Sequence, residues 1–215
     1  MILELADVRK EYDGRPALNG CTGIFSTGGV TALMGPNGSG KSTILRLCAL
    51  LERPDAGAVV YRSEDDSIPH DLSLRRRITL VLPGIGVFND TVSRNVEYGL
   101  RIRSFEKQEA EERVARALEA VGLAHKQQHN ALTLSSGETQ RLGIARAMVI
   151  DPEILFLDEP TAAIDEENKA IVEDSILTMK QEGRTTVIIA THDREQAEKL
   201  ADRVILMRNG VFMNE

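Results

Sequence analysis

The sequence lacks most of the features that would place a protein outside the cell or within a membrane. It has only two cysteines, Cys21 and Cys48, whose spacing fits no metal-binding pattern. Two cysteines give no disulfide framework, which is usual in a reducing cytosol. The start of the chain, Met1 to Glu4, lacks the charged-then-apolar order of a signal peptide. No apolar run is long enough to cross a bilayer, so a role at a membrane requires a partner subunit.

Basic charge is also scarce. The chain has 26 Lys and Arg against 33 Asp and Glu, a net charge of −7, and it contains no basic tract. Proteins that bind nucleic acids generally carry a basic patch or stripe, so we expect no nucleic-acid partner. Internal repeats and low-complexity tracts are absent from the sequence as well. The 215 residues, 42% of them hydrophobic, suffice for one compact unit with a sizeable core and a subdomain.

The strongest positive signal is a glycine-rich segment near the start of the chain. It matches the pattern G-x-x-x-x-G-K-[ST] at every fixed position, and it reads Gly35-Pro36-Asn37-Gly38-Ser39-Gly40-Lys41-Ser42. Glycines leave backbone N–H groups free to curl around phosphate oxygens, and the helix that follows favours anions at its start. We expect Lys41 to bridge the outer phosphates and Ser42 to ligate Mg²⁺. The segment therefore predicts a nucleoside triphosphate and Mg²⁺ as ligands.

Three apolar runs end in polar residues, and together they predict the core of the fold. Continuous apolar runs are typical of parallel strands that are covered on both faces. In open α/β sheets, ligands bind at the carboxyl ends of the strands, so the three polar endings should meet at one edge. The runs and their endings are Val30–Met34 before Gly35, Ile154–Leu157 before Asp158-Glu159, and Val187–Ala190 before Thr191-His192.

Asp158, Glu159 and His192 are the candidate catalytic and metal-binding side chains at this edge. We expect Asp158 to hold Mg²⁺ through its water shell and Glu159 to polarise or deprotonate the attacking water. An Asp-Glu pair is most often a simple turn, but here it follows an apolar strand and a phosphate loop lies upstream. His192 is read as a sensor of the γ-phosphate, although a lone histidine is more often structural.

Between these strands the sequence predicts helices and a second sheet. Helices are expected from about Phe105 to Val121, ending at Gly122, and from Asp165 to Glu182, ending at Gly183. The segments 3–24 and 58–61 are predicted strands of a smaller antiparallel sheet, and Asn209-Gly210 is a hairpin signal. We therefore predict a nucleotide-binding core with an antiparallel β subdomain in 1–83 and 151–215, and an inserted helical subdomain in 84–150.

Two further segments have both a structural and a functional interpretation. Ser135 and Glu138 have the spacing of a capping box and should open a helix from Thr139 to Ile150. An exposed helix start with Ser and Gly is also an anion site, and the two interpretations are compatible. Tyr12 is an aromatic residue that could stack on a base, but packing at the surface or in the core explains it equally well.

Taken together, these residues resemble an ATP-binding cassette (ABC) ATPase, in order over nearly the whole chain. Gly35–Ser42 is similar to Walker A, Leu134–Glu138 to the signature motif, Leu155–Glu159 to Walker B, and Thr161–Asp165 to the D-loop. The resemblance implies an α/β P-loop NTPase with a RecA-like parallel core sheet, and it assigns catalysis to Glu159, His192 and Lys41. Nucleotide binding is assigned to Tyr12, the Walker A residues, Thr43, Ser135, Gly137 and Asp165. Mg²⁺ is assigned to Ser42 and Asp158.

The resemblance also implies a mechanism and partners. Two copies pair head to tail, and each ATP lies between Walker A of one copy and Ser135 and Gly137 of the other. Hydrolysis reopens the dimer and moves integral membrane subunits at the cytoplasmic face of the cell membrane, with a substrate-binding protein as an indirect partner. Segments such as 95–103 and 190–193 look most like prokaryotic importers, among which tungstate and related oxyanion importers are the most similar.

The sequence departs from the family pattern at several positions. Pro83 stands where a Q-loop Gln is expected, and proline has no side-chain amide to hold Mg²⁺ or water. The alternative function is therefore a soluble nucleotide switch that hydrolyses ATP weakly. Ser136 and Glu138 replace the usual Gly and the common Gln of the signature motif. Ile85, Val87 and Phe88 are candidates either for docking a membrane subunit or for packing within the helical subdomain.

Overall fold

The computed structural model describes residues 1–63, 66–162 and 164–213, and these group into two compact units. The first unit comprises Met1–Leu80, Glu153–Glu159 and Met179–Glu215, and the second comprises Val81–Pro152 and Pro160–Thr178. The predicted division into 1–83 with 151–215 and 84–150 stays a prediction. The compact grouping differs from it mainly in that residues 160–178 go with the helical unit.

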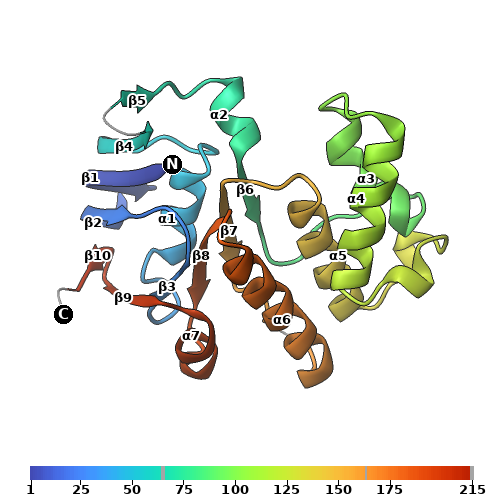
Figure 1. Ribbon diagram of the computed structural model, residues 1–215. Coiled ribbons are helices and arrows are strands. Elements are labelled where there is room, and N and C mark those ends of the chain that lie inside the picture. Colours follow the sequence, from blue (N-terminus) through green and yellow to red (C-terminus); the bar gives the residue numbers. More distant parts are fainter. Residues whose placement is uncertain (64–65, 163, 214–215) are drawn as a thin grey trace. The chain divides into compact units, whose positions relative to one another are not determined.

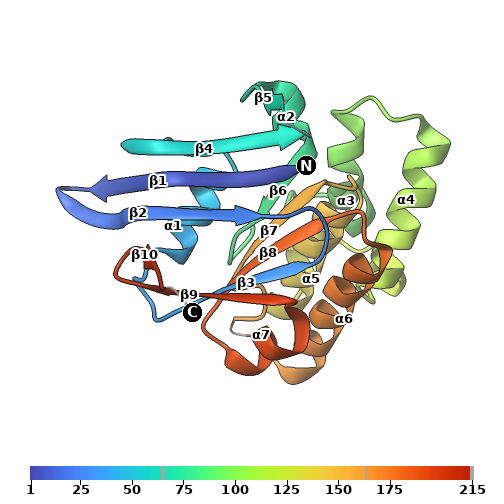
Figure 2. The same ribbon diagram turned by 60° about the vertical axis from the view of Figure 1, so that its left-hand side comes forward.

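The first unit contains the small antiparallel sheet that the sequence predicts. Its strands are β1 (Ile2–Tyr12), β2 (Arg15–Phe25), β4 (Ala56–Ser63) and β5 (Asp66–Ile68), in the order β2-β1-β4-β5. All three pairings are antiparallel, and the long strands lie side by side in Figure 2. Leu3 and Leu5 alternate with more exposed neighbours along β1 and are fully buried, because one face of this sheet covers the core.

The larger sheet of the first unit is the core of the fold. Its strand order is β10-β9-β3-β8-β7-β6. Strand β3 pairs in parallel with β8 and β9, β7 pairs in parallel with β8, and the short β10 is antiparallel to β9. Every residue of β7 and β8 is buried, which explains why their sequences are continuous apolar runs. The bounds are β3 (Val30–Met34), β6 (Ile78–Val81), β7 (Ile154–Asp158), β8 (Thr186–Thr191), β9 (Arg203–Arg208) and β10 (Val211–Phe212).

Helix α1 (Lys41–Cys48) joins the two sheets into one hydrophobic core. Its residues Ile44, Leu45 and Leu47 are fully buried among side chains of both sheets. The short helices α2 (Leu72–Arg77) and α7 (Arg194–Leu200) complete the first unit. The predicted hairpin is confirmed, because Asn209 and Gly210 both have positive φ, 50° and 74°, between β9 and β10.

The second unit is helical. It contains α3 (Val92–Arg101), α4 (Lys107–Ala120), α5 (Ser136–Met148), two 3₁₀ turns (Ala124–Lys126 and Ala131–Thr133) and most of α6 (Glu166–Glu182) (Figure 1). Helix α6 ends at the predicted Glu182, and α4 ends at Ala120, one residue before the predicted Val121. The glycines predicted to stop them, Gly122 and Gly183, follow with φ of 65° and 68°. Helix α5 begins three residues before the predicted Thr139, because Ser135 itself is the N-cap.

Among the helices that the structure describes, none combines the length and the apolar character that crossing a membrane requires.

Candidate functional site

The phosphate loop follows β3 and is packed so tightly that two of its glycines cannot be replaced without movement. A Cβ atom on Gly35 would lie 2.2 Å from the backbone oxygen of Met207, and one on Gly40 would lie 2.8 Å from that of Ala17. Gly40 also has a φ of 104°, which glycine adopts without strain, and it is the N-cap of α1. Close packing against β2 and β9 therefore fixes the loop in front of the helix start.

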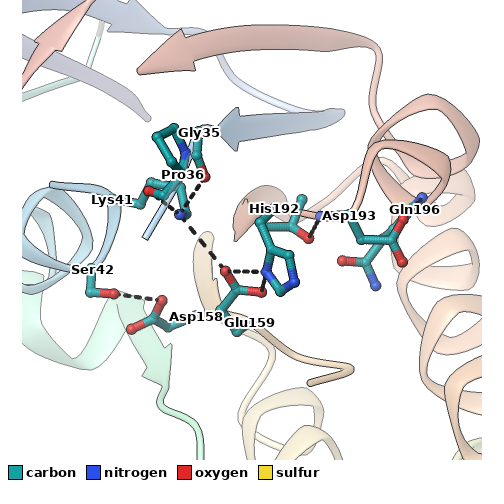
Figure 3. Close-up of polar contacts among 10 residues, drawn as sticks. Gly35, Pro36, Lys41, Ser42, Asp158, Glu159, His192, Asp193 and Gln196 are labelled. Carbon is teal, nitrogen blue, oxygen red and sulfur yellow. Dashed lines mark hydrogen bonds and ion pairs between the residues drawn. The ribbon is translucent and has the colours of Figure 1, made fainter. Parts of the chain in front are cut away.

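Lys41 points back into this loop. Its side chain is 5% exposed, and its Nζ donates hydrogen bonds to the backbone oxygens of Gly35 (2.8 Å) and Pro36 (3.2 Å) (Figure 3). The same Nζ lies 3.8 Å from Oε1 of Glu159. A buried ammonium group needs such partners, since an unpaired charge in the interior is costly. Phosphate oxygens are stronger acceptors than carbonyls, so they can take these positions.

Ser42 and Asp158 form the candidate metal pair. The Ser42 hydroxyl donates to Oδ1 of Asp158 at 2.9 Å, and Asp158 is 2% exposed at the end of β7 (Figure 3). Burial raises the pKa of Asp158, and the hydrogen bond from Ser42 partly opposes this shift. In the described part of the chain, no group of three or more His, Cys, Asp or Glu side chains could hold a metal. Two hard oxygen ligands suit Mg²⁺, which usually keeps waters and takes further ligands from phosphates.

Glu159 and His192 meet at the adjacent strand ends. Nδ1 of His192 lies 3.0 Å and 2.9 Å from the two carboxylate oxygens of Glu159 (Figure 3). The Glu159 backbone has a positive φ of 48°, and its N–H donates to the backbone oxygen of Ala190 in β8. The expected meeting of three polar strand endings at one sheet edge is thus confirmed. The catalytic roles of Glu159 and His192 stay predictions.

The geometry of this edge fits a triphosphate. Oγ of Ser39 is buried and has no hydrogen-bond partner, so an acceptor supplied by a ligand would satisfy it. Gly38 is exposed with a φ of 78°, and a Cβ atom added to it would meet nothing within 4 Å. A pocket of about 400 Å³ opens here, lined by Ala17, Asn37, Gly38, Gly40, Lys41, Ser42, Thr43 and Glu159.

Tyr12 lies at the end of β1 and is 39% exposed. Its hydroxyl donates to the carboxylate of Glu52, and burial together with this hydrogen bond raises the pKa of Tyr12. Nζ of Lys10 lies 5.6 Å from the ring centroid. The ring is therefore anchored at its hydroxyl end and partly open to solvent, and stacking on adenine stays a prediction. Glu52 is a residue that sequence analysis missed, because it is 40 positions away and belongs to no motif.

The signature motif of the second unit forms the predicted capping box. Oγ of Ser135 accepts from the Glu138 backbone N–H at 3.3 Å, and the Glu138 carboxylate accepts from the Ser135 N–H at 3.0 Å. Lys126 adds an ion pair with Glu138 at 2.5 Å. The hydrogen bond from Lys126 is the main reason why the pKa of Glu138 is lowered. No motif or spacing pattern in the sequence points to Lys126 as a partner of Glu138. In the D-loop segment, Asp165 is exposed and belongs to the part of the chain that the structure describes, whereas Ala163 lies outside that part.

Pro83 and the candidate docking residues after it lie in the second unit. Pro83 is exposed. Ile85 packs on α5, where a Cβ on Gly143 would lie 2.3 Å from its Cδ1. Phe88 is exposed and stacks against Tyr98 with ring centroids 4.7 Å apart. Ile85 therefore contributes to packing, while docking of a membrane subunit at Phe88 stays a prediction.

Comparison with known proteins decides the family. A family model described as ABC transporter matches residues 18–162. The phosphate import ATP-binding protein PstB 2 of Natronomonas pharaonis is 38% identical, over 97% of this chain and 77% of its own length. This chain belongs to the ABC transporter family. The cassette is also 33% identical to the tungstate uptake system ATP-binding protein TupC of Peptoclostridium acidaminophilum, over 98% of the chain and 96% of that protein.

Solved structures agree. The ATP-binding cassette MJ0796, solved as a dimer in a post-hydrolysis state with ADP and Pi, superimposes with a TM-score of 0.87 at 28% identity. The match covers 99% of this chain and 97% of that one. The fold is therefore that of an ABC cassette P-loop NTPase with an antiparallel β subdomain. The cassette is an ATP-binding and ATP-hydrolysing subunit of the prokaryotic importer type.

Proposed function

We propose that the cassette powers an oxyanion importer by pairing head to tail with a second copy. The observation that carries the ATPase part is the single sheet edge at which Lys41, the Ser42–Asp158 pair and the Glu159–His192 pair come together. A phosphate cradle, a metal pair and a candidate base in one pocket are the parts that phosphoryl transfer to water needs.

Each side chain has a distinct task in this proposal. Lys41 leaves the loop carbonyls to neutralise the outer phosphates, and Ser42 with Asp158 holds Mg²⁺. When bound, Mg²⁺ supplies positive charge that offsets the charge of the phosphates. Glu159 orients the attacking water and accepts its proton. His192 holds the Glu159 carboxylate in place through its Nδ1.

The second copy supplies the rest of the site. Ser135 and Gly137 start the signature helix in the second unit, where backbone N–H groups and the helix dipole favour a phosphate. In the head-to-tail arrangement these groups contact the nucleotide of the partner. MJ0796, whose structure is a dimer with ADP and Pi, supports this part of the proposal.

The cargo and the remaining partners follow from the relatives. The protein named PstB 2 is a phosphate import protein, and TupC belongs to a tungstate uptake system. Both cargoes are tetrahedral oxyanions, which supports the oxyanion class, with tungstate as the specific proposal. The cassette then acts at the cytoplasmic face of the cell membrane on integral membrane subunits, which a substrate-binding protein loads.

Phosphate release from Mg·ATP, measured against protein concentration, tests the ATPase part. Glu159→Gln serves as the blank, because the amide keeps the shape of the side chain and loses the base. We expect a rate that rises faster than linearly with protein concentration and disappears in the blank. A linear dependence at concentrations where the protein with Mg·ATP sediments as a monomer would exclude the dimer. A rate equal to the blank at every concentration would favour the second candidate below.

Pro83 favours the second candidate, a nucleotide switch that hydrolyses ATP weakly. The residue is exposed and cannot supply the amide expected at this position. Such a switch would bind Mg·ATP and dimerise with it, yet release phosphate no faster than Glu159→Gln.

Uptake by cells tests the cargo. Cells that lack the cassette should lose accumulation of tungstate while phosphate and sulfate uptake stays normal. Restoring the gene should restore uptake, whereas the Glu159→Gln form should not. Loss of phosphate uptake instead of tungstate uptake would move the cargo to phosphate.

A further inference from the structure

In the second unit, the side chain of Asn168 connects the helix of the signature motif to the D-loop segment, although Asn168 itself belongs to no motif. Asn168 lies in the first turn of α6, three residues after Asp165 of the D-loop segment. Its Nδ2 donates to both carboxylate oxygens of Asp165, at 2.8 Å and 2.7 Å. Its Oδ1 accepts from Nε of Arg141, on helix α5, at 2.7 Å. Since the donor and acceptor partners differ, they fix which way round the amide lies.

The Asn168 amide also packs directly against Gly137 of the signature motif. A Cβ atom on Gly137 would lie 2.6 Å, 2.7 Å and 2.9 Å from Cγ, Nδ2 and Oδ1 of Asn168. These are the three atoms nearest to such a Cβ, so a larger residue at this position would displace the Asn168 amide. The contact gives Gly137 a packing requirement in addition to its predicted contact with nucleotide.

Arg141 is held firmly on the other side. It is 7% exposed, and its Nη1 donates to the backbone oxygen of Val121 at 2.6 Å. The chain of bonds therefore runs from a buried arginine on the signature helix, through the Asn168 amide, to the exposed carboxylate of Asp165. Arg141 is held in place at one end of this chain and Asp165 is exposed at the other. Such an arrangement orients the Asp165 carboxylate.

We propose that Asn168 is a positioning residue that fixes Asp165 relative to the signature helix, so that both segments meet the second copy as one preformed surface. The proposal rests on the head-to-tail dimer argued above. In that dimer, Ser135 and Gly137 receive the partner's nucleotide, and Asp165 belongs to the same predicted set of nucleotide-site residues. Preforming the surface lowers the ordering cost of dimer closure.

A purely structural role for Asn168 makes a different prediction. The backbone N–H of Asn168 already donates to Oδ1 of Asp165 at 2.9 Å, which caps the start of α6 without help from the side chain. Substitution of the side chain therefore leaves the cap in place. A purely structural role predicts a lower Tm and unchanged dimerisation of the folded protein, whereas a positioning role predicts weaker dimerisation at temperatures where the variant is still fully folded.

The experiment uses the full chain carrying Glu159→Gln, which should retain bound ATP. Dimerisation with Mg·ATP is measured by sedimentation for this parent and for versions that add Asn168→Ala or Asn168→Asp. Asn168→Ala removes both side-chain links. Asn168→Asp keeps an acceptor for Arg141 but sets a carboxylate against Asp165. Glu167→Gln, on an exposed neighbour in the same turn, is the matched control.

We expect both Asn168 variants to dimerise about tenfold more weakly or worse, because both copies must then order the Asp165 side chain when the dimer closes. Binding of a fluorescent ATP analogue, at protein concentrations below dimerisation, should stay within about twofold of the parent because Walker A is untouched. Glu167→Gln should match the parent. Dimerisation equal to the parent in either Asn168 variant overturns the proposal, as does a loss explained by a matching fall in Tm. A parent that does not dimerise with Mg·ATP instead overturns the proposed function, and this inference with it.

Discussion

At the scale of single residues, Asp158 combines a metal-binding task with an unfavourable position. The carboxylate is almost completely buried, and burial raises its pKa from the ordinary value of 3.8. A raised carboxyl pKa means that the folded state binds the proton more tightly than the unfolded state. Stability is therefore lost as pH rises from 3.8 through the folded-state pKa, and the loss persists at neutral pH.

Replacing Asp158 with Asn should therefore separate stability from function. The neutral amide still accepts from Ser42, so we expect equal or higher thermal stability at pH 7 without nucleotide. Hydrolysis that depends on Mg²⁺ should fall by about two orders of magnitude or more, since metal stabilisation is worth several kcal/mol. Thermal unfolding at pH 3.5 and pH 7 tests this, because the stability difference should vanish at the lower pH. Asp13→Asn, in an exposed turn, is the control, and a variant clearly less stable at pH 7 would contradict the argument.

Glu138 is the opposite case, a carboxylate whose pKa is lowered by Lys126 and by the Ser135 N–H. It therefore contributes stability above its ordinary pKa of 4.5, and this contribution is lost as pH falls through the folded-state pKa. Glu138→Ala should lower the free energy of unfolding by about 1 kcal/mol, as for other lost helix caps. The free energy of ATP binding should change by less. Urea unfolding and nucleotide titration measure the two effects. Glu138→Gln keeps the capping geometry without the charge, so it should recover most of the stability. A large rise in the ATP dissociation constant with unchanged stability would refute this.

At the scale of elements, the strand endings that build the site could be predicted because they obey local rules. Continuous apolar runs gave β3, β7 and β8, and the rule that ligands bind at the carboxyl ends of parallel strands placed Asp158 and Glu159 beside Walker A. The capping box could be found from Ser135 and Glu138 alone, since both partners lie within one turn.

What could not be predicted are contacts between elements distant in sequence. Glu52 beneath Tyr12, Lys126 beside Glu138 and Asn168 against Gly137 each depend on how two elements pack. No pattern of spacing carries that information. Short elements were missed for another reason. Strand β5 has three residues and α7 has seven, too few for a periodic signal. Asp193, labelled in Figure 3, caps α7 by accepting from the Gln196 N–H at 3.1 Å.

The close packing of Gly57 in the antiparallel sheet can be tested by comparison with Gly14, a glycine of similar φ in an open turn. Gly57 in β4 has a φ of 77°, and its Cβ would lie 2.2 Å from the backbone oxygen of Asp7. Gly14, in the β1–β2 turn, has a φ of 72° and nothing within 4 Å of such a Cβ. We expect Gly14→Ala to cost about 1 kcal/mol for the left-handed backbone alone. Gly57→Ala should cost at least about 2 kcal/mol more, because backbone must move. Urea unfolding followed by circular dichroism measures both, and equal costs would show that the strand shifts freely.

At the scale of the whole molecule, Pro83 is the departure from the family pattern whose effect on turnover we test. Pro83 belongs to the second unit, whereas Asp158 and Glu159 belong to the first. Pro83→Gln should raise the rate of phosphate release at saturating Mg·ATP by about tenfold. The gain is expected to be smaller than that from a general base, because the amide would only position water or Mg²⁺ and would not transfer a proton. Pro83→Ala removes the ring without adding the amide and should leave the rate unchanged. If both variants release phosphate at the same rate, the amide at this position is irrelevant to turnover.

The order of strands in the core sheet also sets when the protein can fold during its synthesis. Strand β3 is complete by Met34, yet its two neighbours, β8 and β9, span Thr186–Thr191 and Arg203–Arg208. At translation rates of about 5–20 residues per second, β3 waits roughly 10–30 seconds for a partner on either side. During this time an apolar strand has two unpaired edges, which is a hazard for aggregation. The β1–β2 hairpin, whose strands are adjacent in sequence, is free to form early. Successful production of the cassette thus depends on preventing β3 from aggregating until its partners β8 and β9 have left the ribosome.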